Sequence, residues 1–197
     1  MFKEQVILLL NNKIVLQVSE IIKILNVQPL YYSFLNREIK ELENDDFIKS
    51  VGDNIYTIVY KSRWGDVIPS EEEIVYYFYV LNNQGYISGA TYLNYIGISS
   101  LVPHLKQIVS NKYNIPIYNL KHTELTKPKV YINSSNVKYL QLLDGIYDFY
   151  NNHCDAKYPL DVFKDLIIKF KLDKDALYET ASCIYPQIVY DTLLKIL

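Results

Sequence analysis

The chain has 197 residues, half of them hydrophobic, and its 22 acidic and 20 basic side chains give a net charge of −2. This length fits one large domain or two small ones, and the hydrophobic fraction supports a packed core and argues against disorder. The apolar runs at residues 6–10 and 74–81 are shorter than the ~20 residues that a membrane span needs, and the N-terminus lacks a signal-peptide cleavage site. Two cysteines, Cys154 and Cys183, do not make a disulfide framework, so we expect a cytoplasmic protein with no membrane partner.

The first sixty residues are predicted to form three helices, a short strand and a hairpin. The helices cover residues 2–10, 19–25 and 29–43, the strand covers residues 13–16, and the hairpin strands cover residues 47–51 and 55–58. Ser19 suits an N-cap, Pro29 suits the first turn of a helix, and the turn at residues 52–54 is typical of a hairpin. This order is that of a winged helix-turn-helix, in which one helix enters the DNA major groove and the hairpin is the wing.

The predicted helix over residues 29–43 is amphipathic. At about 100° per residue its apolar stripe would consist of Tyr31, Leu35, Ile39 and Leu42, with Phe34 off the stripe and unexplained. The polar face and the hairpin supply the predicted DNA contacts, which are Ser33, Asn36, Arg37, Lys40 and Lys49. A solvated helix face remains the alternative.

A second domain is predicted over residues 64–197, after a first domain over residues 1–63. Residues 60–69 have the composition of a linker, and Ser70 with Glu73 forms a capping box that begins a helix. Further helices are predicted at residues 89–95, 136–150, 160–170, 174–184 and 186–197, and strands at residues 106–110, 115–118 and 129–132. The pattern predicts an α+β domain with a C-terminal helical part.

The charge changes sign within this second domain. Residues 104–138 contain six lysines and one acid, Glu124, between two acidic stretches. We expect the strands of this segment to form a sheet that presents Lys121, Lys127 and Lys129 to phosphates of DNA, or to RNA or an acidic protein. Replacing the three lysines by glutamine should then flatten the salt dependence of DNA binding and leave the fold intact. A solvated surface is the alternative.

The sequence supplies no candidate for catalysis, for a cofactor or for a metal. Asp144 and Asp148 share a helix face, which we interpret as solvated, and Cys183 lies in an apolar stretch that favours a buried thiol. His153, Cys154 and Asp155 are adjacent in the chain, and adjacent residues rarely point at one ion. We therefore expect a protein that is not an enzyme.

Residues 85–98 resemble a segment of the AbiEi-like antitoxins. Ala90, Leu93 and the pair Gly97-Ile98 occupy the places of that family's pattern, with isoleucine where leucine is usual. Residues 101–103, 106–110 and 177–197 are also similar to the family, and residues 35–42, 47–49 and 55–57 resemble its winged-helix pattern.

This resemblance implies a winged-helix domain followed by an α+β antitoxin domain. It also implies a repressor that binds its own operator and counters a nucleotidyltransferase toxin without forming a stable complex with it. Better-known members of the family are more basic than this chain. A non-enzymatic interaction module, whose winged helix contacts a protein, is the alternative function.

Overall fold

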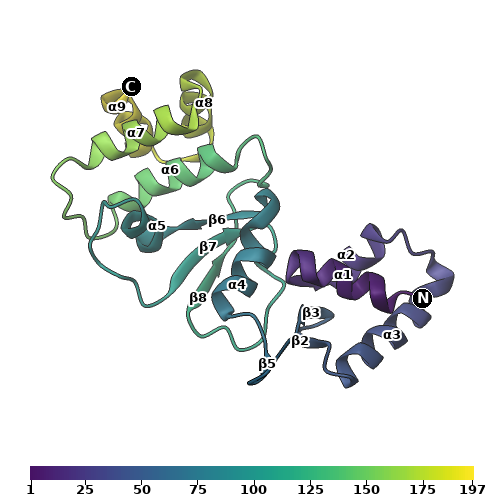
Figure 1. Cartoon of the computed structure of the whole chain (residues 1–197). Coiled ribbons are helices and arrows are strands. Elements are labelled where there is room, and N and C mark those ends of the chain that lie inside the picture. Colours follow the sequence, from purple (N-terminus) through teal and green to yellow (C-terminus); the bar gives the residue numbers. More distant parts are fainter. The chain divides into compact units, whose positions relative to one another are not determined.

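The computed structural model describes residues 1–197 and shows a mixed α+β fold (Figure 1). The chain divides into two compact units. The first comprises Met1–Phe78 and Ile115–Leu120, and the second comprises Tyr79–Asn114 and Lys121–Leu197. The first unit therefore contains two segments, residues 64–78 and Ile115–Leu120, that lie beyond the predicted boundary at residue 63.

The first unit contains the predicted helices, strand and hairpin in the predicted order. They are α1 (Lys3–Lys13), β1 (Val15–Gln17), α2 (Val18–Ile24), the 3-10 turn η1 (Pro29–Tyr31), α3 (Tyr32–Asn44), β2 (Ile48–Gly52) and β3 (Ile55–Ile58). The three strands form an antiparallel sheet in the order β1-β3-β2. Its core joins α1, α3 and the sheet through Val6, Leu10, Leu35, Ile39 and Ile48.

A buried glutamate makes the interface between α1 and α3 different from the predicted apolar stripe. Glu38 is only 6% exposed and accepts a hydrogen bond of 2.6 Å from the backbone N–H of Phe2. Tyr31, which belongs to the predicted stripe, is 44% exposed instead. Phe34 is explained, since its ring meets the ring of Phe2 edge-on at 6.1 Å between centroids. The helix α2 begins at Val18, and its N-cap is Gln17, two residues before the expected N-cap Ser19.

The predicted linker at residues 60–69 is wrong, because most of it forms a second hairpin. Its strands are β4 (Tyr60–Ser62) and β5 (Gly65–Val67), joined by Arg63 and Trp64. Gly65 adopts a φ of 115°, a conformation that side chains disfavour, so it can close this turn where another residue could not. The predicted capping box of Ser70 and Glu73 is confirmed at the start of α4 (Glu71–Val75), which continues as a π-helical turn (Tyr76–Val80) and a 3-10 turn (Leu81–Asn83).

The second unit consists of a three-stranded sheet and a group of helices. The strands are β6 (Gly85–Ser88), β7 (Lys106–Ser110) and β8 (Thr123–Thr126), and the helices are α5 (Gly89–Tyr95), α6 (Val137–Phe149), α7 (Pro159–Phe170), α8 (Lys174–Ile184) and α9 (Gln187–Ile196). β7 is the central strand, antiparallel to β6 and parallel to β8. α6 contacts β6 and α5 on one side and α7, α8 and α9 on the other, so it forms the centre of the core (Figure 1).

Two predicted strands of the basic segment are wrong, and two strands of the sheet in the second unit were not predicted. Residues 115–118 form only a single bridge, between Ile117 and Gly52. Residues 129–132 form no strand, since Pro128 interrupts the segment and the side chain of Asn111 replaces a neighbouring strand as the partner of Ile132. The missed strands are β6 and β8, which are short and flank β7.

Gly145 permits close packing in the middle of α6. A β-carbon at this position would lie 2.6 Å from a ring carbon of Tyr92, which is buried beneath the helix. The missing side chain therefore lets α5 and α6 approach each other. None of the helices is both long enough and apolar enough to cross a membrane.

Candidate functional site

The outer face of α3 carries the side chains that the sequence predicted for DNA contact. Ser33, Asn36, Arg37 and Lys40 are all exposed, and Lys49 is exposed on β2. The opposite side of α3 is fixed in the core by Leu35, Ile39 and Leu42. The helix is therefore held by its apolar side and presents a polar face with two cations to solvent.

The two cations of this face are held differently. The guanidinium of Arg37 lies 4.7 Å from the centre of the Phe34 ring, and its Nε is 3.8 Å from the carboxylate of Glu41. Glu41 is also paired with Lys3 at 2.8 Å, so its charge is already shared. Lys40 forms no ion pair in the structure. Both side chains can therefore turn toward an anion at small cost, since exposed ion pairs contribute only ~0–1 kcal/mol.

The turn between β2 and β3 is covered by another part of the first unit. The backbone N–H of Tyr118 donates to the carbonyl of Val51 at 2.6 Å, and the hydroxyl of Tyr118 bonds to the carboxylate of Asp53. Gly52 pairs with Ile117 in a β-bridge. This turn is therefore short, acidic and occupied by residues 115–120.

The structure separates the three lysines that were predicted to act together in the second unit. Lys121 and Lys127 are exposed at the two ends of β8. Lys129 instead forms an ion pair with Asp144, and its ammonium lies 4.6 Å from the centre of the Tyr185 ring. Lys129 is therefore engaged inside its own unit, and we do not include it among the proposed DNA contacts.

Asp144 and Asp148 lie in a buried polar cluster, so the interpretation of a solvated helix face is wrong. Asp144 is 5% exposed and accepts a 2.5 Å hydrogen bond from the hydroxyl of Tyr86 in addition to the ion pair with Lys129. Asp148, one turn later, accepts a 2.7 Å hydrogen bond from the backbone N–H of Gly89. The cluster thus ties α6 to β6, to the start of α5 and to the segment after β8.

Burial dominates the proton affinities in this cluster. It raises the pKa of Asp148 to about 6, the charge of Asp144 adds to the effect, and the hydrogen bond from Gly89 opposes it. Burial and the neighbouring carboxylate of Asp144 also raise the pKa of the Tyr86 hydroxyl, which stays protonated and donates to that carboxylate. The cluster borders a cavity of about 250 Å³. Asp148 is therefore a carboxyl group that can exchange a proton near neutral pH.

The raised pKa of Asp148 predicts a pH-dependent gain of stability in Asp148→Asn. Because the pKa is about 6 in the folded protein and ordinarily 3.8, the folded state binds the proton more tightly, and ionisation lowers the stability as the pH rises through this interval. Asparagine keeps an acceptor for Gly89 without the charge. We expect the variant to be more stable by about 1–2 kcal/mol near pH 8, after allowance for partial exposure.

Urea denaturation of both proteins near pH 4 and near pH 8 measures this difference. The gain in the free energy of unfolding should shrink toward zero near pH 4. At that pH, Asp148 is protonated in the folded wild-type protein, so asparagine removes no buried charge. If Asp148→Asn changes the free energy of unfolding by the same amount at both pH values, the ionisation of Asp148 does not cause the change.

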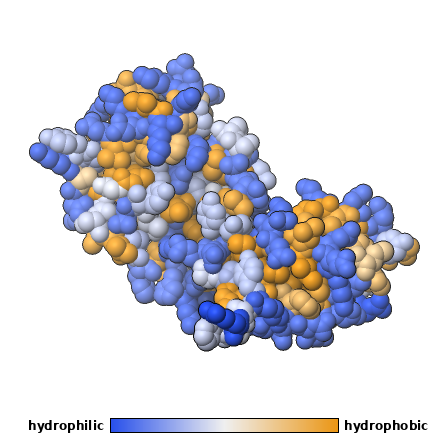
Figure 2. Space-filling view, viewed as in Figure 1, coloured by the Kyte–Doolittle hydropathy of each residue, from blue (hydrophilic) through white to orange (hydrophobic).

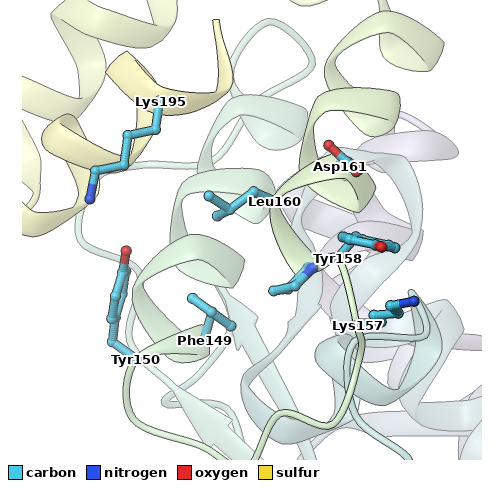
Figure 3. Close-up of a pocket in the computed structure, with 8 residues that line it drawn as sticks. Phe149, Tyr150, Lys157, Tyr158, Leu160, Asp161 and Lys195 are labelled. Atoms are coloured by element: carbon cyan, nitrogen blue, oxygen red, sulfur yellow. The ribbon is translucent and has the colours of Figure 1, made fainter.

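A second cavity, of about 360 Å³, lies between α6, α7 and α9 (Figure 3). In this view Tyr150 and Lys195 lie on one side and Tyr158 and Lys157 on the other, with Phe149 and Leu160 between them. The amino group of Lys157 lies 5.1 Å from the centre of the Tyr158 ring. The cavity thus combines apolar walls with two amino groups.

The histidines and cysteines are not arranged for metal binding. No group of three or more His, Cys, Asp and Glu side chains is placed to hold a metal ion. Asp155, next to His153 and Cys154, accepts hydrogen bonds from the backbone N–H and hydroxyl of Ser100. Cys183 is exposed, so the expectation of a buried thiol is wrong.

The comparisons with known proteins do not assign the chain to a family. No family model matches it, and no curated protein matches it.

Proposed function

We propose that the first unit is a winged helix-turn-helix domain that binds double-stranded DNA, and that the protein represses transcription of its own operon. One observation carries this proposal: α3 follows α1, β1 and α2 in the order of the motif, beside a β1-β3-β2 sheet, and exposes Ser33, Asn36, Arg37 and Lys40 on one face. A helix fixed by its apolar side, with polar and cationic groups outward, suits the major groove, where such groups meet base edges and phosphates.

The second unit is, in this proposal, an antitoxin domain that counters a nucleotidyltransferase toxin. The resemblance of residues 85–98 to AbiEi-like antitoxins supports it. This segment includes all of β6 and all of α5, which pack on α6 in the centre of the unit. The role requires no catalytic group in this chain, because the antitoxin acts on the expression or the activity of the toxin.

A protein-binding role for the first unit is the second candidate, and one observation favours it. Hydrophobic side chains gather on the visible face of this unit (Figure 2). Separately, Leu8 on α1 and Ile24 on α2 are 63% and 45% exposed. Leu30, just before α3, is 82% exposed. Exposed apolar side chains in one region are typical of a protein interface. In that case, α3 would contact a protein and DNA would bind weakly and without sequence preference.

A reporter gene placed behind the DNA upstream of the protein's own gene tests the repressor in cells. We expect the wild-type protein to lower expression, and Arg37→Ala with Lys40→Ala to restore it. Lys164→Ala with Lys169→Ala is the matched control, since it removes two exposed cations from α7 in the second unit. Equal repression by both double variants would contradict the role of α3.

The antitoxin activity is tested separately by co-expression with the nucleotidyltransferase toxin that the proposal places in the same operon. The wild-type protein should restore growth of cells that produce the toxin. If repression of the reporter is intact and growth is not restored, the antitoxin half of the proposal is wrong and the repressor half stands.

A further inference from the structure

The hairpin of β4 and β5 carries the chain's one tryptophan at its tip. Trp64 is 84% exposed, and the guanidinium of Arg63 lies 4.9 Å from the centre of its ring. In Figure 1 the hairpin is found beside the label β5. A large aromatic side chain left in water at such a position is unusual, because its burial would stabilise the fold.

Hydrogen bonds within the hairpin define the turn that presents Trp64. Lys61 forms an ion pair of 2.7 Å with Asp66 across the strands. The hydroxyl of Ser62 donates to the carbonyl of Gly65 at 2.6 Å and accepts from the backbone N–H of Trp64 at 3.1 Å. These bonds order the turn before any contact is made, which reduces the entropy lost on binding.

The β4–β5 hairpin begins at the end of the β1-β3-β2 sheet that is nearest to the C-terminus of α3. β2 starts shortly after α3, its first residue Ile48 pairs with Ile58 at the end of β3, and the N–H of Val59 donates to the carbonyl of Phe47 at 3.0 Å. β4 begins two residues after β3. Each strand of the hairpin has three residues, so its tip lies about 10 Å from the start of β4. This length is comparable to the ~12 Å width of the major groove.

We propose that Arg63 and Trp64 enter the DNA minor groove beside the major groove that α3 occupies, so that the β4–β5 hairpin is the DNA-contacting wing. The inference rests on the proposed DNA-binding function. It departs from the expected wing, the β2–β3 turn, because that turn carries Asp53 and is covered by residues 115–120. The narrow minor groove attracts arginine by its negative potential, and an apolar ring can wedge against the sugars and bases there.

Intrinsic fluorescence tests the inference, because all tryptophan emission of the wild-type protein comes from Trp64. The probe is a short duplex from the DNA upstream of the protein's own gene. We expect its addition to quench or shift the emission, and Trp64→Ala to weaken binding of the labelled duplex about tenfold, in line with the loss of an aromatic contact to bases. Tyr131→Ala, which removes a ring that is 75% exposed in the second unit, should leave binding unchanged.

The outcomes distinguish the hairpin from the proposed function. If the duplex binds and depends on Arg37 and Lys40, but the emission of Trp64 and the affinity of Trp64→Ala do not change, the hairpin inference is wrong and the proposed function stands. If Trp64→Ala keeps DNA affinity and loses only the rescue of growth, the hairpin contacts a protein and the inference is wrong. If the wild-type protein binds no duplex, both proposals fail. Circular dichroism of the variant confirms that it is folded.

Discussion

Replacing Lys129 by methionine is expected to destabilise the second unit by about 2–3 kcal/mol, because the carboxylate of Asp144 would then be buried without its cation. Asp144 is 5% exposed and would keep only uncharged partners, the hydroxyls of Tyr86 and Tyr185. The expected loss is below that of a fully buried pair, since the side chain of Lys129 is 38% exposed. Urea denaturation followed by far-UV circular dichroism measures it.

Two variants separate this charge effect from a loss of packing. In an Asp144→Asn background no buried carboxylate remains, so Lys129→Met should cost much less than in the wild-type protein. Lys127→Met, at an exposed lysine two residues away, should change the stability by less than ~0.5 kcal/mol. If Lys129→Met costs the same in both backgrounds, the ion pair with Asp144 does not explain the effect.

The largest expected effect on binding is that of Arg37→Ala combined with Lys40→Ala. Both cations lie on the exposed face of α3, and one bidentate contact to a base contributes ~1–3 kcal/mol of discrimination. We expect the double variant to bind operator DNA about 100-fold more weakly. Each lost phosphate contact should lower the slope of log affinity against log salt by ~0.9.

Fluorescence anisotropy of a labelled operator duplex over a salt series measures both quantities. The double variant Lys164→Ala with Lys169→Ala has the same change of net charge and should keep the wild-type affinity and slope. Identical weakening by both double variants would indicate a general effect of charge, with no special role for α3.

The sequence predicts those parts of the fold in which local signals and burial agree. The helical spacing of Leu35, Ile39 and Leu42 predicts α3, and the capping box of Ser70 and Glu73 predicts the start of α4. The exposed positions of Ser33, Asn36, Arg37 and Lys40 follow from the same period. The candidate DNA-binding face could therefore be predicted without a structure.

The parts that could not be predicted depend on contacts between distant residues. Asp144 is separated from Tyr86 by 58 residues and from Lys129 by 15, and no local pattern shows that the three meet. Hence the sequence treats Lys129 as equivalent to Lys121 and Lys127. Glu38 is buried for the same kind of reason, since its partner Phe2 lies 36 residues away.

The β4–β5 hairpin was missed for a different reason. Its strands have three residues each, and all six of these residues are exposed, so they show no alternation of polar and apolar positions. Gly65 and Pro69 indicate a break in regular structure, which is equally compatible with a linker. The sequence offers one signal, the pair Arg63-Trp64 next to a glycine, since a tryptophan in a segment with turn residues and charges is typical of a contact surface.

The most direct test of DNA binding compares two duplexes of equal length and composition, one from the DNA upstream of the protein's own gene and one scrambled. Binding of the wild-type protein to both is measured by fluorescence anisotropy. We expect the native duplex to bind at least ~10³-fold more tightly than the scrambled one, with an affinity that falls linearly in log salt. Equal affinity for both duplexes, or no binding to either, would contradict the proposal that this protein is a sequence-specific repressor.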